Sequence, residues 1–180
     1  MESMNLQNNM HQLIYEFLEQ TFEEARAGYC TKVEISLLPG GKVKITDNGR
    51  GLPFSKDLHA NKAVLDKVLS GSPITNAEYS QMGDLNSAGL QTVNSLCEEL
   101  QVTVTRDGAQ YQQDYICGIA QHGLTISDSV RASGTEIMLK PIRSIFGDTA
   151  FSQELLDKWL KDRSADIVNL KVNILCNHIL

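Results

Sequence analysis

The stretch "ITDNGRGLP", residues 45–53, places a carboxylate and two glycines close together. Asp47 comes first, and Gly49 and Gly51 follow it with one residue between them. An ionised carboxylate accepts hydrogen bonds, and glycine adopts backbone conformations that other residues avoid. These residue types suit a ligand-binding turn, but a solvated surface turn uses them as well. The elements on either side must therefore decide between the two interpretations.

A second group of acidic and amide side chains lies nearer the N-terminus. Between residues 5 and 27 the apolar residues recur at steps of three and four, which predicts an amphipathic helix. Gly28 is typical of the end of such a helix. The same spacing places four polar residues along one flank: Glu16, Gln20, Glu23 and Glu24. A glutamate in such a position is usually a solvated charge, so the spacing alone assigns no chemistry.

Alternating apolar and polar residues predict the strands that hold these groups. Runs at 32–38 and 42–46 flank "PGG" and predict a hairpin, which places Asp47 at a strand end. Beyond it, the sequence predicts a helix at 61–71, a polar loop at 72–86, a helix at 88–100, a hairpin at 101–116, strands at 123–127 and 134–140, a helix at 152–163 and a strand at 169–176. The expected fold is one α/β domain spanning residues 1–180. It is a two-layer sandwich with helices on one face of a mostly antiparallel sheet.

The composition favours a globular protein and disfavours several classes of function. Apolar residues make up 42% of the chain, and 22 acidic residues against 16 basic ones give a net charge of -6. This balance disfavours direct DNA binding, which needs clustered lysine and arginine. The four cysteines and four histidines are scattered, which indicates free thiols and disfavours a metal cluster. Because the sequence has no secretory pattern and no apolar run of roughly 20 residues, we expect a cytoplasmic protein without a membrane partner.

Four stretches of the chain together indicate a family. They are "HQLIYEFLEQTFEEARAGYC" at 11–30, "KITDNGRGLP" at 44–53, "AGLQTVNSLCEEL" at 88–100 and "SGTEIML" at 133–139. In this order they resemble the ATP-binding domain of the GHKL superfamily, and within it the ATPase domain of the gyrase B and topoisomerase IV ParE subunits. A single short glycine motif would be weak evidence, but four motifs in register are specific. The resemblance implies the Bergerat ATP-binding fold, with ATP as substrate and Mg²⁺ as its metal ion.

The resemblance also implies how the base is bound. Asp47 matches the aspartate that accepts a hydrogen bond from the adenine amine, and Gly49 and Gly51 match glycines that let the backbone approach the ring. Pro53 stiffens the exit from this turn. Thr135 matches a hydroxyl that supports the same aspartate and a bound water.

Further residues match positions around the rest of the nucleotide. Glu16 matches the general base that activates the water attacking the terminal phosphate. Glu24 and Arg50 match a salt-bridged pair at the pocket mouth, where the guanidinium can lie flat over the base. Arg106 matches an arginine of the pocket rim, and a plain solvated arginine is an equal alternative. Gln20 stands where the family has the asparagine that binds Mg²⁺. Its longer amide would reach the metal through another rotamer or a water, so we expect weaker metal support.

The phosphate-binding lid differs from the family pattern. The family reads G-G-L-H-G-V-G and wraps the phosphates with main-chain N–H groups ahead of a helix. Here the stretch is "GDLNSAG", in which Gly83 and Gly89 are retained, Asp84 and Ser87 replace glycines, and Asn86 replaces the histidine. Residues 74–82 also carry no lysine or arginine. We therefore expect reduced affinity for the phosphates.

The length of the chain leads to expectations about partners. The family's N-terminal dimerisation arm, its transducer and its domain for coupling to DNA cleavage have no counterpart in these 180 residues. A homodimer, DNA and a DNA-cleaving gyrase A or ParC-type subunit are thus expected as partners only of a longer form. The main functional expectation is an ATPase domain of a type II DNA topoisomerase. The alternatives are a nucleotide-binding module that acts through a protein partner without useful hydrolysis, and a histidine-kinase or Hsp90-like use of the fold.

Overall fold

The structure, a computed structural model, describes residues 2–52, 69, 87–128 and 132–176. Its helices are α1 (Glu2–Arg26), α4 (Ser87–Leu96), α5 (Arg143–Phe146) and α6 (Gln153–Arg163), with a 3-10 turn at Pro39–Gly41. Its strands are β1 (Lys32–Leu38), β2 (Lys42–Asp47), β3 (Cys97–Arg106), β4 (Ala109–Ile116), β5 (Ile119–Ala120), β6 (Thr125–Asp128), β7 (Gly134–Pro141) and β8 (Lys171–Cys176).

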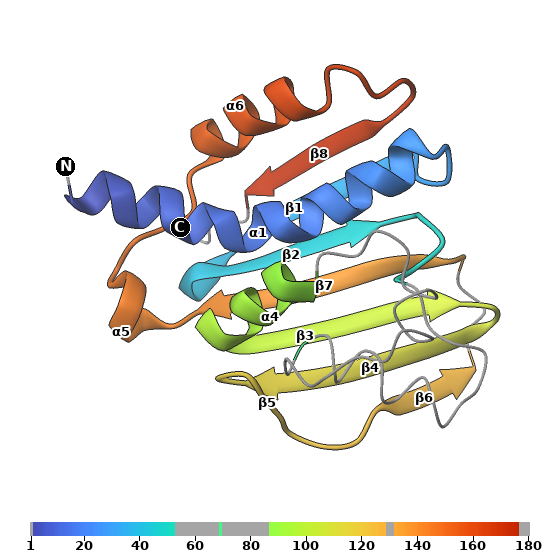
Figure 1. Ribbon diagram of the computed structural model, residues 1–180, viewed down its shortest axis with the longest axis horizontal. Helices are drawn as coiled ribbons and strands as arrows, with labels where there is room; N and C mark the ends of the chain where they lie inside the picture. Colours follow the sequence, from blue (N-terminus) through green and yellow to red (C-terminus); the bar gives the residue numbers. More distant parts are fainter. Residues whose placement is uncertain (1, 53–68, 70–86, 129–131, 177–180) are drawn as a thin grey trace.

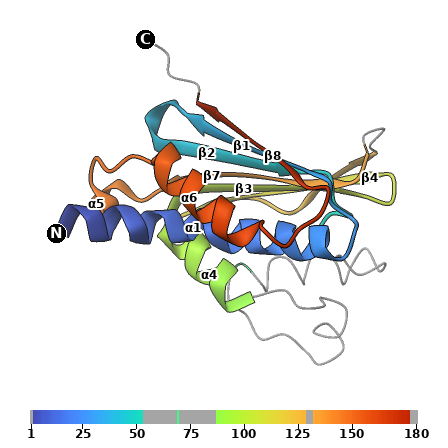
Figure 2. The ribbon, with the colours of Figure 1, turned by 90° about the horizontal axis from the view of Figure 1, so that it is seen from above.

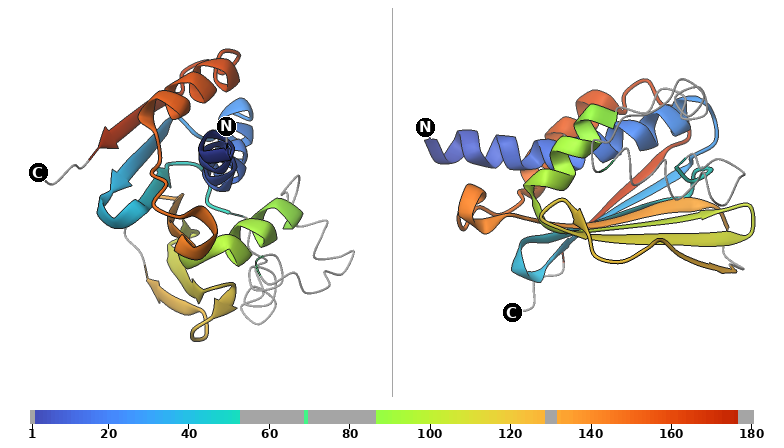
Figure 3. Two further views of the ribbon diagram at one scale, coloured as in Figure 1. Left: turned by 90° about the vertical axis from the view of Figure 1, so that its left-hand side faces the viewer. Right: turned by 60° about the horizontal axis from the view of Figure 1, so that its bottom comes forward.

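These elements form two layers. The strands make one eight-stranded sheet in the order β5-β4-β3-β7-β2-β1-β8, with β6 paired to β4. Among the described strands, β1 and β8 alone run parallel. Helices α1, α4 and α6 lie on one face of this sheet, with α1 across its middle (Figure 1, Figure 2). The views of Figure 3 show no described helix on the opposite face. The predicted two-layer sandwich with a mostly antiparallel sheet is therefore confirmed.

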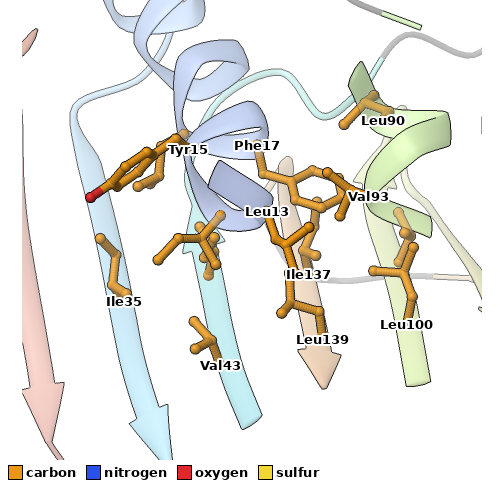
Figure 4. Close-up of a cluster of buried hydrophobic side chains, with 14 of the residues drawn as sticks. Leu13, Tyr15, Phe17, Ile35, Val43, Leu90, Val93, Leu100, Ile137 and Leu139 are labelled. Carbon is orange, nitrogen blue, oxygen red and sulfur yellow. The ribbon is translucent and has the colours of Figure 1, made fainter. Parts of the chain in front are cut away.

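The core lies between α1, α4 and the central strands. Alternate residues of each strand point toward the helices, so the side chains on that face are apolar and buried. Figure 4 shows this cluster, which includes Leu13, Tyr15 and Phe17 of α1, Leu90 and Val93 of α4, and Ile35, Val43, Leu100, Ile137 and Leu139 of the sheet. Each such side chain contributes about 1.5 to 3 kcal/mol on burial. This packing holds α1 across the middle of the sheet (Figure 1).

Contacts with α6 fix α1 from its other side. The indole ring of Trp159 stacks on Tyr15, with 4.2 Å between ring centroids, and lies 5.6 Å from the ring of Phe22. The ring of His11 is fully buried, and its Nε2 atom accepts a hydrogen bond of 2.9 Å from the main-chain N–H of Ser152, the N-cap of α6. The position of α1 is therefore set by the sheet below it and by α6 beside it.

One predicted boundary is wrong. The helix expected at 88–100 ends at Leu96, and Cys97–Arg106 forms β3. Residues 97–100 carry apolar and polar residues at a helical spacing, but they pair with Pro141, Lys140 and Leu139 of β7. Pairing within the sheet overrides the local pattern here, as tertiary contacts commonly do.

Other elements were predicted less completely. The short β5 and α5 were not predicted, and the strand expected at 123–127 is Thr125–Asp128. The expected loop at 72–86 lies outside the described residues. So does the expected helix at 61–71, except for Leu69, which is helical and buried. In the described part of the chain, no helix is both long and apolar enough to cross a membrane, and no cluster of His, Cys, Asp or Glu is suited to hold a metal ion.

Candidate functional site

Asp47 lies where three elements meet. It is the last residue of β2. Its carboxylate accepts hydrogen bonds from the turn after β2, from β7 and from α1. Its Oδ1 atom accepts from the main-chain N–H of Gly49 at 2.9 Å and from that of Thr135, in β7, at 3.1 Å. Its Oδ2 atom accepts from the hydroxyl of Thr21, on α1, at 3.2 Å. This carboxylate is therefore held in one orientation by donors from three parts of the chain.

Close backbone packing around this carboxylate requires glycine. A Cβ atom added to Gly134 would lie closer than 3.0 Å to the main-chain oxygen of Asp47. Gly51 has a φ of +80°, and a Cβ there would lie 2.9 Å from the main-chain oxygen of Thr105. The glycines at 49, 51 and 134 thus allow the turn after β2 to pack closely against Asp47 and against the backbone of β3 and β7. At Gly51 and Gly134 this packing consequently leaves no room for a Cβ atom.

The environment of Asp47 has two opposing effects on its charge. Burial raises the pKa of this carboxyl, because desolvation disfavours the ionised form. The hydrogen bonds from Gly49, Thr135 and Thr21 lower the pKa, and the negative charge of Glu24 raises it further. Burial has the larger effect, so the pKa of Asp47 is above its ordinary value. The three hydrogen bonds therefore favour the ionised form of Asp47 and oppose the effect of burial.

Glu24 and Arg50 form an ion pair beside this turn. The Nη2 and Nε atoms of Arg50 donate to the two oxygens of Glu24 at 2.7 and 3.0 Å, and the main-chain N–H of Arg50 donates to Oε2 at 3.2 Å. These contacts with Arg50 lower the pKa of Glu24. The guanidinium carbon lies 3.6 Å from the centre of the Tyr29 ring. The predicted pair is therefore present, and in this structure Arg50 stacks on Tyr29.

The remaining predicted residues on the sheet side lie at the edge of the turn. Arg106, at the end of β3, is half-buried, and its Nη1 atom is 3.5 Å from the main-chain oxygen of Gly51. The hydroxyl of Thr135 accepts a hydrogen bond of 3.2 Å from the main-chain N–H of Leu52. Thr135 therefore contacts Asp47 through its main chain and the exit of the turn through its side chain.

Glu16 and Gln20 lie along α1 in line with Glu24. All three side chains are half-buried, and their spacing of four residues places them on one flank of the helix. Since an α-helix rises 1.5 Å per residue, Glu16 is about 12 Å along the axis from Glu24. The two predicted phosphate-side residues are therefore on the same helix as the ion pair, toward its N-terminal end.

The predicted lid is described only at its last residues. Ser87 and Gly89 lie in the first turn of α4, and Gly89 is half-buried. Pro53, Gly83 and the lid residues up to 86 lie outside the described residues.

The sequence analysis missed two residues of this site. Asn48 joins the turn to the start of β1: its Oδ1 atom accepts from the main-chain N–H groups of Thr31 and Lys32 at 2.9 and 2.8 Å, and its Nδ2 atom donates to the Thr31 hydroxyl at 2.9 Å. Thr21 is the other missed residue. A signal for it exists in the sequence, because it is a polar residue between Phe17 and Phe22 on the apolar face of the first helix.

Comparison with known proteins places this arrangement in a family. No family model matches the chain. The gyrase B protein of Thermotoga maritima is 31% identical over 167 residues, covering 91% of this chain and 26% of that protein. The chloroplastic/mitochondrial gyrase B protein of Oryza sativa is 39% identical over 150 residues, covering 78% of this chain and 21% of that protein. The chain thus spans about a quarter of the length of the curated relatives it matches.

A solved structure has the same fold. The crystal structure of the 43K ATPase domain of Thermus thermophilus gyrase B in complex with an aminocoumarin matches with a TM-score of 0.77 and 25% identity, over 93% of this chain and 43% of that one. The sequence relatives and this structural match agree with the family resemblance that the sequence indicates. The chain therefore belongs to the family of gyrase B-type ATPase domains of the GHKL superfamily.

Proposed function

We propose that this chain binds ATP at the site around Asp47 and hydrolyses it, as the ATPase domain of a type II topoisomerase subunit. The observation that carries this proposal is the Asp47 carboxylate, which three donors hold in place beside the close contact of β2 and β7. Such a fixed acceptor suits the exocyclic amine of adenine. The gyrase B relatives support ATP as the nucleotide.

The reaction is proposed to use the flank of α1. Glu16 would act as the general base toward the attacking water. Its distance of about 12 Å along the helix from Glu24 suits a ligand that extends from a base to a terminal phosphate. Gln20 would supply one oxygen ligand to Mg²⁺, which prefers few protein ligands and several phosphate and water oxygens. When bound, Mg²⁺ would neutralise charge on the phosphates.

The rest of the gyrase-type activity is proposed for a longer form of the protein. Its partners there would be a second copy of the same chain, DNA and a DNA-cleaving subunit of the gyrase A or ParC type, in the cytoplasm. Gly83 and Gly89 would border the phosphates from the lid. The alternative is a nucleotide-binding module without useful hydrolysis, which the replacements at Gln20 and Asp84 favour.

Two measurements test the proposal and separate it from the alternative. Calorimetric titration with ADP and a non-hydrolysable ATP analogue, with and without Mg²⁺, should show binding that Asp47→Asn weakens at least roughly tenfold, because a donor replaces an acceptor. Glu16→Gln should lower ATP turnover by about 10² to 10⁴-fold and leave binding unchanged.

A matched control comes from the same helix. Glu19→Gln removes one negative charge from α1 at a carboxylate that pairs with Arg163 at 3.2 Å. Its turnover should equal that of the unmodified chain. Equal turnover in Glu16→Gln would exclude Glu16 as the base. Asp47-dependent binding without turnover, insensitive to Mg²⁺, would favour the binding module.

A further inference from the structure

Thr21 donates to Oδ2 of Asp47, whereas both described main-chain donors to this carboxylate bind Oδ1. Its side chain is 4% exposed, and its hydroxyl lies 3.2 Å from Oδ2 of Asp47 and 3.3 Å from the main-chain oxygen of Phe17. A hydroxyl has a single proton, and an ionised carboxylate is a stronger acceptor than a main-chain carbonyl. When Asp47 is ionised, the proton of Thr21 therefore points to Oδ2.

The two oxygens of Asp47 differ in their remaining capacity. Oδ1 accepts two main-chain N–H groups, from Gly49 and Thr135, and a carboxylate oxygen accepts about two hydrogen bonds. Among the described residues, the donor at Oδ2 is the hydroxyl of Thr21. Oδ2 therefore keeps one free acceptor position for a ligand, and Thr21 determines its direction.

The charge of Asp47 decides which purine this position accepts. An ionised carboxylate only accepts, which matches the 6-amino group of adenine. A protonated carboxyl also donates, which matches the 6-oxo group of hypoxanthine or guanine. A donor to Oδ2 favours the ionised form, and loss of that donor favours the neutral form.

We propose that Thr21 is a specificity-determining residue of the site, whose hydroxyl holds Asp47 as an acceptor and so selects 6-amino over 6-oxo purine nucleotides. This inference rests on the proposed function, since it assumes that Asp47 contacts the base. Thr21 is a positioning residue that acts through Asp47. The two main-chain donors to Oδ1 remain with any side chain at their positions, so Thr21 is the donor that substitution can remove.

Among the described residues, the titratable and charged groups near Asp47 do not supply the hydrogen bond that Thr21 donates to Oδ2. Glu24 on α1 raises the pKa of Asp47, and its own charge is paired with Arg50. The Cys30 thiol, before β1, stays neutral because burial and then Asp47 raise its pKa. Arg106 at the end of β3 lies near Gly51. None of these described groups donates a hydrogen bond to Asp47, so the three hydrogen bonds themselves oppose the effect of burial.

A pair of substitutions separates the hydroxyl from the shape of the side chain. Thr21→Val keeps the volume and branching and removes the hydroxyl, whereas Thr21→Ser keeps the hydroxyl. Each variant is titrated with ADP and with inosine diphosphate from about pH 5.5 to about pH 8.5. We expect Thr21→Val to reduce the preference for ADP over inosine diphosphate by roughly tenfold. As the pH falls and Asp47 becomes protonated, this variant should lose ADP binding at a higher pH than the unmodified chain does. Thr21→Ser should behave like the unmodified chain.

The outcomes distinguish failure of this inference from failure of the proposed function. Equal weakening of both nucleotides by Thr21→Val, with the pH profile unchanged, would mean that Thr21 only shapes the pocket and would overturn the inference. Absence of Asp47-dependent ADP binding in the unmodified chain would overturn both. A second measurement needs no nucleotide: NMR of the Asp47 carboxyl carbon should show protonation at higher pH in Thr21→Val, or in Thr21→Ala if the valine variant does not fold, than in Thr21→Ser. Identical titrations would contradict the role of Thr21.

Discussion

Replacing Gly134 with alanine is expected to destabilise the protein and to remove nucleotide binding. The added Cβ would lie closer than 3.0 Å to the main-chain oxygen of Asp47, 3.2 Å from its carbonyl carbon and 3.4 Å from the Cα of Asn48. These are backbone atoms, so no change of rotamer relieves the overlap. β2 and β7 must therefore move apart at the position of the site.

The cost follows from two contributions. Overpacking of a well-packed interior costs about 1 to 3 kcal/mol. Separation of the strands also breaks the 3.1 Å hydrogen bond from the main chain of Thr135 to Asp47, and a hydrogen bond to a charged group contributes about 1.5 to 3 kcal/mol. Together they predict a loss of about 2.5 to 6 kcal/mol, which lowers the melting temperature by roughly 5 to 24 °C in a domain of this size.

The assay uses thermal unfolding and ADP titration of the same samples. The single tryptophan, Trp159, is stacked on Tyr15 of α1 and reports unfolding by fluorescence. The control is Gly108→Ala, at a φ of +81° in the turn between β3 and β4, where an added Cβ has no atom within 4 Å. It should cost about 1 to 2 kcal/mol from backbone conformation and leave ADP binding intact. Equal stability of the two variants, or normal ADP binding by Gly134→Ala, would refute the steric argument.

Two further predictions concern the turn that follows β2. Burial raises the pKa of Asp47, so the stability that this group contributes is present in acid and is lost as the pH rises through its raised pKa. Asp47→Asn should therefore raise the melting temperature at neutral pH, by about 2 to 4 °C for each kcal/mol, and a gain that does not shrink in acid would contradict this reasoning. Asn48→Ala removes the hydrogen bonds to Thr31 and Lys32 and should cost about 1 kcal/mol in this exposed position while weakening ADP binding. In calorimetric and melting experiments Thr31→Val, which loses one of those hydrogen bonds, should have a smaller effect. An effect equal to that of Asn48→Ala would contradict the proposed contribution of these hydrogen bonds.

Local features of the sequence predicted much of the fold. The first helix has a long apolar periodicity, and the structure forms it as α1 from Glu2 to Arg26. The predicted turn at Asp107 and Gly108 is present, and both residues have positive φ, as the Asp-Gly pair favours. The strand before Asp47 is also where the alternation places it. Each of these features depends on residues that are neighbours in the sequence.

Non-local pairing explains where prediction failed. Residues 97–100 have a helical spacing, yet β7 draws them into the sheet. The short strand β5 exists because Ile119 and Ala120 lie opposite Ile116 and Tyr115 of β4. No local pattern contains this information, because each pairing depends on the position of a strand elsewhere in the chain.

The candidate site divides in the same way. The sequence by itself determined the types of its residues, the carboxylate at a strand end, the glycines after it and the acidic flank of α1, because periodicity and turn chemistry act over a few residues. Only the tertiary structure decided which donors meet Asp47. Thr21 is 26 positions away and Thr135 is 88 positions away. They reach the same carboxylate because packing of α1 on the sheet and pairing of β2 with β7 bring distant segments together.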